Sequence, residues 1–593
     1  MKSLQGVVVS PGIAIGRAYV YQPGVPVAVL LKVDDVEQEI TRFRHALEVA
    51  KAQIESIQSR AIAEVGEETA AIFAAHAMFL EDPELLGQIT GRIEADGIYA
   101  EFAVQETIDS YAAIFAAMED EYMCARGADI EDVGQRLLRV LMGKEEVPLS
   151  ELRSPVIVIA HDLTPSDTAR MNKEMVLGFA TETGGKTSHT AIMARILGIP
   201  AVVALGQLLD EVQTGNTIIV DGGEGLLVVG PDDGTISEYQ SRRGEDQKHQ
   251  DALRKDAQLR AVTADGHAFD VAANIGDVES ARSAVDFGAE GVGLLRTEFL
   301  YLNRTTLPDE EEQYQAYVAI AEAMGGRPIV IRTLDIGGDK QLPYLDIGEE
   351  QNPFLGWRAI RYCLDHPELF KTQLRAILRA GALYNLRMMF PMIATLDETR
   401  RAKRMVEEAK DELRSGGYSY DPDIEVGIMI EIPAAALAAD ALAREVDFFS
   451  IGTNDLIQYT MACDRGNERV GYLYEPLHPT ILRLIQQVIA AAHRHGKYVG
   501  MCGEMAGDPE AIPLLLGMSI DLLSMNPAAI PRAKQVIREI RIDEALTLAD
   551  EAVRCCSAEE VRALVAEFMV AVGGSVWNSV APESTMSPGQ REK

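Results

Sequence analysis

Residues 426–455 read VGIMIEIPAAALAADALAREVDFFSIGTND. Two short apolar runs, 426–430 and 448–451, enclose an alanine-rich stretch that is long enough for a short helix. A buried strand, a helix and a second buried strand form the repeating unit of a parallel sheet that is covered on both faces. Each run is followed at once by polar side chains, Glu431 after the first and Asn454 with Asp455 after the second.

The same pattern extends over residues 262–572. Longer helical patterns separate eight short apolar runs, which are 271–275, 291–295, 329–334, 386–392, 426–430, 448–451, 498–501 and 521–525. Eight strands that alternate with helices are what a (β/α)8 TIM barrel needs. The sequence therefore predicts a C-terminal barrel.

Polar or reactive side chains stand at the C-terminal ends of these runs. They are Arg296, Arg332, Glu431, Asn454 with Asp455, and Cys502. In a (β/α)8 barrel, the C-terminal ends of all strands meet at one face, and catalysis takes place there. We therefore expect one active site that is built from several strands.

The N-terminal part of the chain changes its pattern twice. Short apolar runs before residue 32 and again after Pro155 are typical of strands, whereas the region between them has an apolar seam at helical spacing, as in Ile40, Phe43 and Leu47. We predict an α/β multidomain protein made of an α/β domain (1–32 and 144–235), an inserted helical bundle (33–143), a charged linker helix (236–261), the barrel (262–572) and a flexible tail (573–593).

Composition limits the possible partners. The chain of 593 residues has 91 acidic and 55 basic side chains, which gives a formal charge of −36. Such a charge repels nucleic acids and anionic membranes, since both are bound through clustered Lys and Arg. We see no export signal, no apolar run long enough to span a bilayer and no metal-ligand spacing among the six cysteines. We expect a cytoplasmic protein that neither enters membranes nor binds nucleic acid.

A second motif, GGKTSHTAIMAR, occupies residues 184–195. His189 follows a glycine turn, lies beside hydroxyl groups and precedes a helical pattern. A neutral imidazole is nucleophilic near pH 7, and free N–H groups at the start of a helix can hold phosphoryl oxygens. A lone histidine is more often a capping or packing residue, but the motif around His189 favours a nucleophile.

Two carboxylates, Glu431 and Asp455, end neighbouring predicted strands. Such a pair can share a hard cation whose other ligands are water and substrate oxygens. Each acid alone is equally compatible with an ordinary salt bridge. Because arginines accompany the pair, we expect a Mg²⁺ site.

Four arginines belong to the predicted catalytic face: Arg296, Arg332, Arg358 and Arg465. A planar guanidinium group binds phosphate and carboxylate through two parallel hydrogen bonds. Any one of the four is compatible with a surface salt bridge. Together, in a very acidic protein, they indicate a small substrate with two or three negative charges.

The motif at 184–195 resembles the phosphohistidine signature of the phosphoenolpyruvate-utilising enzymes, and Asp447 to Arg465 resembles a second signature of that family. Residues 4–572 as a whole resemble its Enzyme I branch, which serves bacterial sugar phosphotransferase systems. The resemblance implies a phosphotransferase that moves the phosphoryl group of phosphoenolpyruvate (PEP) to His189 and on to the phosphocarrier protein HPr, the first step of sugar uptake, with release of pyruvate.

The resemblance also implies individual roles. Thr168 fixes the ring of His189, and Cys502, which the bare sequence favours as a small buried residue, donates a proton to C3 of the enolate. Further implications are that the helical bundle docks HPr and that the barrel forms a homodimer. The residues expected to bind PEP are Arg296, Arg332, Arg358, Asn454, Asp455 and Arg465.

Two other functions are disfavoured. A dikinase that makes PEP from pyruvate and ATP shares both signatures but needs a large nucleotide-binding domain, and only 183 residues precede Gly184, with no Gly-rich phosphate loop among them. A catalytically dead scaffold should have lost His189, a metal carboxylate or an arginine. All of these are present.

Overall fold

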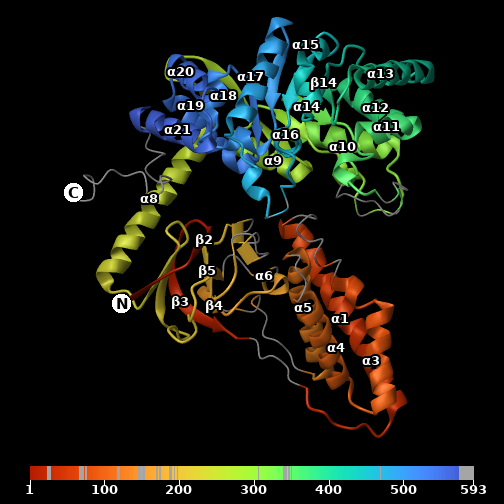
Figure 1. The fold of residues 1–593 in the computed structure, drawn as a ribbon, viewed down its shortest axis with the longest axis vertical. Coiled ribbons are helices and arrows are strands. Elements are labelled where there is room, and N and C mark those ends of the chain that lie inside the picture. The colour runs from red at the N-terminus through yellow and green to blue at the C-terminus, as the bar shows by residue number, and fades with distance from the viewer. Residues whose placement is uncertain are drawn as a thin grey trace. The chain divides into compact units, whose positions relative to one another are not determined.

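The computed structural model consists of two compact units, Met1–Lys248 and His249–Lys593 (Figure 1). Each unit is described by itself. The structure describes residues 1–22, 28–65, 73, 76–116, 121–143, 149, 152, 154–168, 171, 175–185, 190–191, 194–195, 198–302, 304, 306–337, 344, 348, 350–465, 467 and 469–572.

The first unit contains an eight-stranded mixed sheet with the strand order β1-β8-β7-β3-β4-β5-β6-β2. The strands before residue 22 are built into the same sheet as those after residue 155, because β3 pairs in parallel with β4 and β2 pairs antiparallel with β6. The strands are β1 (Lys2–Gln5), β2 (Val7–Ser10), β3 (Ile13–Tyr21), β4 (Val156–Ala160), β5 (Val176–Thr181), β6 (Ala201–Val203), β7 (Thr217–Asp221) and β8 (Leu226–Val229).

A bundle of four long helices lies between β3 and β4 in the sequence and packs side by side in Figure 1. The predicted seam is buried, since Ile40 and Phe43 are 9% and 1% exposed. The helices are α1 (Val36–Val65), α3 (Pro83–Asp96), α4 (Ala100–Ala116) and α5 (Glu121–Leu141). Short α6 (Pro165–Thr168) follows β4, and α8 (Asp233–Ala257) contains most of the segment interpreted as a linker.

The second unit is a closed barrel of eight parallel strands. Strands β10 to β17 pair in sequence order, and the last strand, β17, pairs with the first, β10, to close the ring. The strands are β10 (Ala268–Ile275), β11 (Val292–Leu295), β12 (Ile329–Arg332), β13 (Leu386–Phe390), β14 (Val426–Ile430), β15 (Phe448–Ile451), β16 (Tyr498–Met501) and β17 (Leu522–Met525), with β9 (Ala261–Val262) antiparallel to β10. The predicted fold class is confirmed.

Helices cover the barrel and pack on the outward side chains of its strands. They are α9 (Val278–Asp286), α10 (Glu310–Ala323), α11 (Ile360–Asp365), α12 (Pro367–Gly381), α13 (Leu396–Gly416), α14 (Pro433–Leu437), α15 (Ala439–Leu442), α16 (Thr453–Met461), α17 (Pro479–Arg494), α18 (Ile512–Gly517), α19 (Ile530–Glu539), α20 (Ile542–Ala552) and α21 (Ala558–Val572), with short 3₁₀ turns such as η2 (Glu298–Leu300). In the described part of the chain, every helix is too short or too polar to cross a bilayer.

Alternation along the strands brings the functional side chains to one end of the barrel interior. Val330 and Met429 point into an apolar interior cluster, whereas their strand neighbours pack outward. Gly427 leaves room for that cluster, since a Cβ there would lie 2.4 Å from the Phe448 ring. With a period of two, the next inward residues are Arg332 and Glu431. The strand periodicity therefore aims these side chains at the C-terminal face.

Lys534 of α19 joins the end of α8 to the barrel. Its side chain is 1% exposed, and Nζ donates to the carbonyl oxygens of Ala257, Leu259 and Gly288 at 3.0, 3.1 and 2.8 Å. The Glu290 carboxylate lies 2.9 Å away and balances the charge. A Cβ at position 288 would come within 2.1 Å of the Ala257 oxygen, so only glycine allows this close approach. The end of α8 is thus fixed to the barrel.

We expect Lys534→Ala to lower the free energy of unfolding of the barrel by about 3 kcal/mol, because a half-buried carboxylate loses its counter-ion and three carbonyl groups lose the ammonium donor. Urea unfolding followed by circular dichroism measures this loss. Arg538, one turn later, also donates to Asp256 and Leu259 but from an exposed position. Arg538→Ala should cost about 1 kcal/mol or less. Equal losses from both variants would contradict the anchor role of Lys534.

Candidate active site

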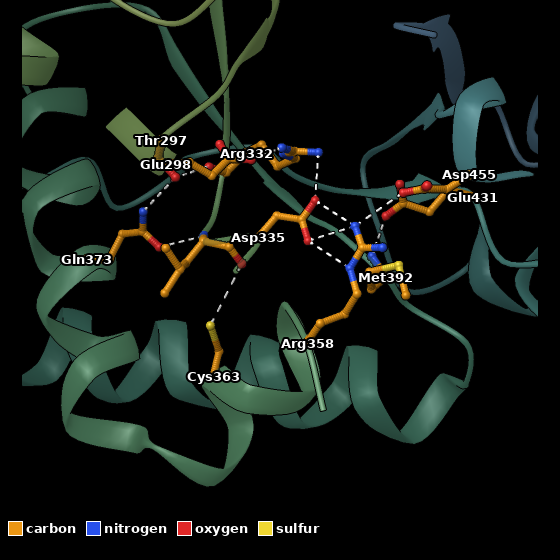
Figure 2. A network of polar contacts seen from close by, with 11 residues as sticks. Thr297, Glu298, Arg332, Asp335, Arg358, Cys363, Gln373, Met392, Glu431 and Asp455 are labelled. Atoms are coloured by element: carbon orange, nitrogen blue, oxygen red, sulfur yellow. Dashed lines mark hydrogen bonds and ion pairs between the residues drawn. The ribbon is translucent and has the colours of Figure 1, made fainter. Parts of the chain in front are cut away.

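Buried charged side chains form a connected network at the C-terminal ends of the barrel strands (Figure 2). Each is at most 8% exposed, and they come from the segments after β11, β12, β14 and β15 and from the start of α11. The network consists of Glu298, Arg332, Asp335, Arg358, Glu431 and Asp455. Such clustering of buried charge is costly, which is why it marks functional sites.

Arg332 ends strand β12 with its guanidinium group held by two carboxylates. Nη1 lies 3.0 Å from Asp335 Oδ2, and Nη2 pairs with Glu298 Oε1. Its Nε has no hydrogen-bond partner among the described residues. A guanidinium donor that is buried and unpaired is available to a ligand oxygen.

Arg358 faces Arg332 across Asp335. Its Nη2 lies 3.2 Å from both oxygens of Asp335 and 3.3 Å from Asp455 Oδ2, and Nη1 donates to the Tyr459 hydroxyl at 3.2 Å. The next residue, Ala359, has φ of 54°, which is uncommon for a residue with a side chain. Strained backbone of this kind concentrates at functional sites.

Glu431 is 2% exposed and accepts a hydrogen bond from the Met392 N–H at 2.5 Å. The pKa of the Glu431 carboxyl is raised to about 8, chiefly by burial and then by the nearby carboxylates of Asp455 and Asp335, against the lowering effect of Arg332 and Arg358. Burial and two neighbouring carboxylates thus act together against the ionised form of Glu431.

The donor set fits a hard cation with few protein ligands. Within the described ranges, no group of three or more His, Cys, Asp or Glu side chains is arranged to hold a metal. The predicted pair, Glu431 and Asp455, supplies two carboxylates, and Mg²⁺ is usually bound by one or two carboxylates with water and substrate oxygens. A divalent cation there would offset the repulsion between Glu431 and Asp455, which contributes to the raised pKa of Glu431 after burial.

Cys502 follows strand β16 and is 5% exposed. Its Sγ lies 3.8 Å from the Ile451 carbonyl oxygen, and its own carbonyl accepts from Asn274 Nδ2 at 2.9 Å. Burial raises the pKa of the Cys502 thiol to about 11, with Glu431 adding to the rise and Arg332 and Arg296 opposing it. The thiol therefore keeps its proton at neutral pH, as a proton donor must.

A pocket of about 500 Å³ opens beside this network. Arg296, Asn454 and Cys502 line it together with acidic residues such as Asp277 and Glu504. Asn454 is fixed there, because its Oδ1 accepts from the Glu504 N–H at 2.9 Å and its Nδ2 donates to Glu504 Oε1 at 3.2 Å. The pocket is large enough for a three-carbon phosphate ester.

Arg465 lies at the edge of the site and is exposed. Its N–H donates to Gln458 Oε1 of α16 at 3.1 Å. Burial raises the pKa of Tyr474 to about 12, and the charges that act on this tyrosine include Glu504, Arg465 and Asp455. Tyr474 thus lies within electrostatic range of Arg465, of Asp455 and of Glu504, which lines the pocket.

The predicted nucleophile lies in the first unit, and His189 falls outside the described residues. Its proposed partner Thr168 ends α6, is 1% exposed and donates to the Thr164 carbonyl at 3.2 Å. Thr190, which follows the histidine, is buried and donates to the Leu163 carbonyl at 2.6 Å. The roles of His189 and Thr168 stay predictions.

Two residues of the network, and Tyr459 next to it, had no predicted role. Asp335 bridges both arginines, Glu298 pairs with Arg332, and Tyr459 accepts from Arg358. A sequence signal existed for each: Asp335 stands three residues after a strand-end arginine, Glu298 two residues after another, and Tyr459 one helical turn after Asp455. None of these spacings identifies the partner.

Comparisons with known proteins agree with this geometry. Family models match residues 5–126 (PEP-utilising enzyme, N-terminal), 152–225 (PEP-utilising enzyme, mobile domain) and 250–542 (PEP-utilising enzyme, PEP-binding domain). The charge network and the pocket lie entirely within the third match.

Curated relatives are similar over nearly their whole length. A phosphoenolpyruvate-protein phosphotransferase of Staphylococcus carnosus is 49% identical over 568 residues, covering 96% of this chain and 99% of the relative. Proteins of the same name from Geobacillus stearothermophilus and Bacillus subtilis are 50% and 48% identical and cover 95% and 96% of this chain, with 98% and 100% of their own length aligned. The chain therefore belongs to the PEP-utilising enzyme family, among its phosphoenolpyruvate-protein phosphotransferases.

Proposed function

We propose that this chain takes the phosphoryl group of PEP onto its own His189, releases pyruvate and passes the phosphoryl group to the phosphocarrier protein HPr, the first step of sugar uptake by a phosphotransferase system. One observation carries the proposal. Arg332 and Arg358, both buried, converge with the carboxylates of Glu431 and Asp455 beside a pocket of about 500 Å³. The similarity of nearly the whole chain to phosphoenolpyruvate-protein phosphotransferases supports it.

The substrate is bound by cations in a buried setting. Arg296, Arg332 and Arg465 bind the phosphate, with Arg358 beside them, because guanidinium groups match its oxygens in charge and geometry. The backbone at Asn454 and Asp455 lies near the PEP carboxylate. The support is that Arg296 and Asn454 line the same pocket and that Arg332 has a buried donor without a partner among the described residues.

Glu431 and Asp455 are the residues that would hold Mg²⁺. When bound, the ion supplies positive charge that neutralises phosphate and carboxylate oxygens of the substrate. Arg358 orients Asp455 through its ion pair, and the Met392 N–H orients Glu431. Both carboxylates are thus held in fixed positions before a ligand enters.

The transfer itself makes one bond and breaks one. A ring nitrogen of His189 bonds to phosphorus while the bond from phosphorus to the enol oxygen breaks, and its electron pair stays on the enolate. The Cys502 thiol then gives its proton to C3, which yields pyruvate, and the thiolate regains a proton from water. Because His189 belongs to the first unit and the pocket to the second, transfer requires the two units to meet.

Three further features belong to the proposal. HPr docks on the helical bundle of residues 33–143, the barrels of two chains form a homodimer, and the protein works in the cytoplasm. The formal charge of −36 supports a basic carrier protein, since complementary charge raises association rates.

We expect His189→Ala to abolish phosphorylation of the protein by labelled PEP and to leave PEP binding intact, because nucleophile and substrate site lie in different units. Peptide mapping after incubation with labelled PEP, Mg²⁺ and HPr measures the first effect, and calorimetric titration measures the second. His161→Ala is the matched control, since His161 is an exposed histidine of the same unit whose Nδ1 pairs with Glu182. Label on the His189 variant would overturn the assignment.

We expect the affinity for Mg²⁺ to rise about tenfold per pH unit from pH 6 to 8 and to level off above pH 8. The reason is that Glu431, with its pKa of about 8, must lose one proton before it can act as a ligand. Titration calorimetry of the full chain with Mg²⁺ measures this dependence. Glu431→Gln should bind Mg²⁺ weakly and equally at all these pH values. Equal wild-type affinity at pH 6 and pH 8 would place the metal elsewhere.

We expect Cys502→Ala to slow pyruvate formation by about 10²-fold while the KM for PEP changes little, since a proton donor acts after binding. Wild-type enzyme acting in deuterated water on PEP labelled stereospecifically at C3 should add deuterium to one face of C3. The control is Cys363→Ala, which removes another buried thiol that does not line the pocket. Random labelling by wild type, or full activity of Cys502→Ala, would leave Cys502 a packing residue.

A further inference from the structure

Two loops carry two of the arginines of the site, Arg296 and Arg332, and both loops continue past the end of a strand. The loop after β11 contains Arg296, Thr297 and Glu298, and the loop after β12 runs from Arg332 to Asp335. Beyond the strand ends the sheet no longer supplies hydrogen bonds, so each buried backbone group needs another partner. The position of the arginines depends on what those partners are.

Gln373 of α12 supplies partners to both loops at once. Its side chain is fully buried. Oε1 accepts from the Leu334 N–H at 2.9 Å, and Nε2 donates to Thr297 Oγ1 at 3.2 Å. Figure 2 shows Gln373 at the left, joined to Thr297 by a dashed line and on the side of Asp335 away from Arg358 and Asp455. The side-chain amide of Gln373 is therefore hydrogen-bonded to both loops.

The hydrogen bonds close a ring. Thr297 Oγ1 accepts from Gln373 and donates to the Arg332 carbonyl oxygen at 3.0 Å. Because the Leu334 N–H can only donate, the carbonyl side of the Gln373 amide must face it, and the NH₂ side must then face Thr297. The ring fixes the backbone on both sides of position 333, and thereby the direction in which Arg332 leaves the strand.

A buried glutamine on α12 lowers the stability of the fold unless its amide makes hydrogen bonds. The rest of the inward face of α12, including Phe370, Leu374 and Ile377, is apolar and fully buried. A buried amide without partners would destabilise this core, and an apolar residue of the same size would pack without that cost. Gln373 also donates to the Tyr317 hydroxyl at 3.2 Å, so both of its Nε2 hydrogens have acceptors. A fully satisfied polar group in an apolar core specifies one geometry.

We propose that Gln373 is a positioning residue for substrate binding: it locks the β11 and β12 loops in register, so that their arginines meet the phosphate of PEP together. This inference rests on the proposed function. Two guanidinium groups bind one phosphate well only when their separation is fixed beforehand, because loop ordering otherwise subtracts from affinity. Gln373 touches neither substrate nor metal and acts through the backbone of the two loops.

The test measures PEP binding in the full chain. The His189→Ala background prevents turnover, and PEP is titrated calorimetrically in the presence of Mg²⁺. Gln373→Met keeps the length of the side chain and removes both of its loop hydrogen bonds. We expect its Kd for PEP to rise by about tenfold, the effect of roughly one lost pair of buried hydrogen bonds.

Gln313→Met is the matched control. Gln313 of α10 is also fully buried, and its amide binds the Tyr301 and Tyr317 hydroxyl groups and the Pro308 carbonyl. It lies in the same core, and the hydrogen bonds of its amide go to Tyr301, Tyr317 and Pro308 and not to the residues of either arginine loop. Its substitution should destabilise the protein to a similar degree and change the Kd for PEP by about twofold at most.

A second pair of variants tests the same ring at Thr297. Thr297→Val removes the hydroxyl that receives the Gln373 hydrogen bond, whereas Thr297→Ser keeps it, so only Thr297→Val should weaken PEP binding by about tenfold. This pair decides the matter if Gln373→Met does not fold. An unchanged Kd in Gln373→Met or Thr297→Val, or equal loss in Gln313→Met, overturns the inference alone. If the His189→Ala chain binds no PEP at all, the proposed function falls and the inference falls with it.

Discussion

The carboxylate of Asp335 lies between the guanidinium groups of Arg332 and Arg358, and the catalytic face of the barrel depends on this arrangement. All three side chains are at most 7% exposed. Two buried cations without a counter-ion would destabilise the fold by several kcal/mol each, as a rough magnitude. Asp335 makes it possible to keep both arginines out of water and still close enough to act on one anion.

The same face of the barrel also contains an unfavourable arrangement of carboxylates. Glu431 is buried among other carboxylates, and its raised pKa of about 8 measures the cost of keeping it ionised there. A barrel optimised for stability alone would replace Glu431 with an apolar residue, as at Val330 or Met429 lower in the same interior. The barrel interior thus has two layers. Apolar side chains such as Val330 and Met429 stabilise the barrel, and charged side chains at the C-terminal ends of the strands are stabilised only when a ligand is bound.

The strands and their terminal residues could be predicted because the information is local. Four or five apolar residues make a buried parallel strand, and the residue that follows it reaches the catalytic face whatever the rest of the chain does. Contacts between side chains from different strands cannot be predicted in this way. Arg358 is separated along the sequence by 23 residues from Asp335 and by 97 from Asp455, yet it pairs with both. The sequence shows that Gln373 is a polar residue on the apolar face of α12. It does not show that Leu334 and Thr297 are its hydrogen-bond partners. The histidine motif was read from sequence alone and stays a prediction.

In the proposed reaction the nucleophile and the substrate pocket belong to different units, so the segment that joins the units must allow them to come together. Lys534 binds the carbonyl oxygens of Ala257 and Leu259, and Arg538 binds those of Asp256 and Leu259, so three residues at and just beyond the end of α8 are bound to α19. Basic side chains at a helix C-terminus also interact favourably with the helix dipole. Residues 256–259 therefore move as part of the barrel. In the proposed transfer, any change in the direction of the first unit that brings the predicted nucleophile His189 to the PEP site must arise on the N-terminal side of this anchor, because residues 256–259 belong to the barrel unit.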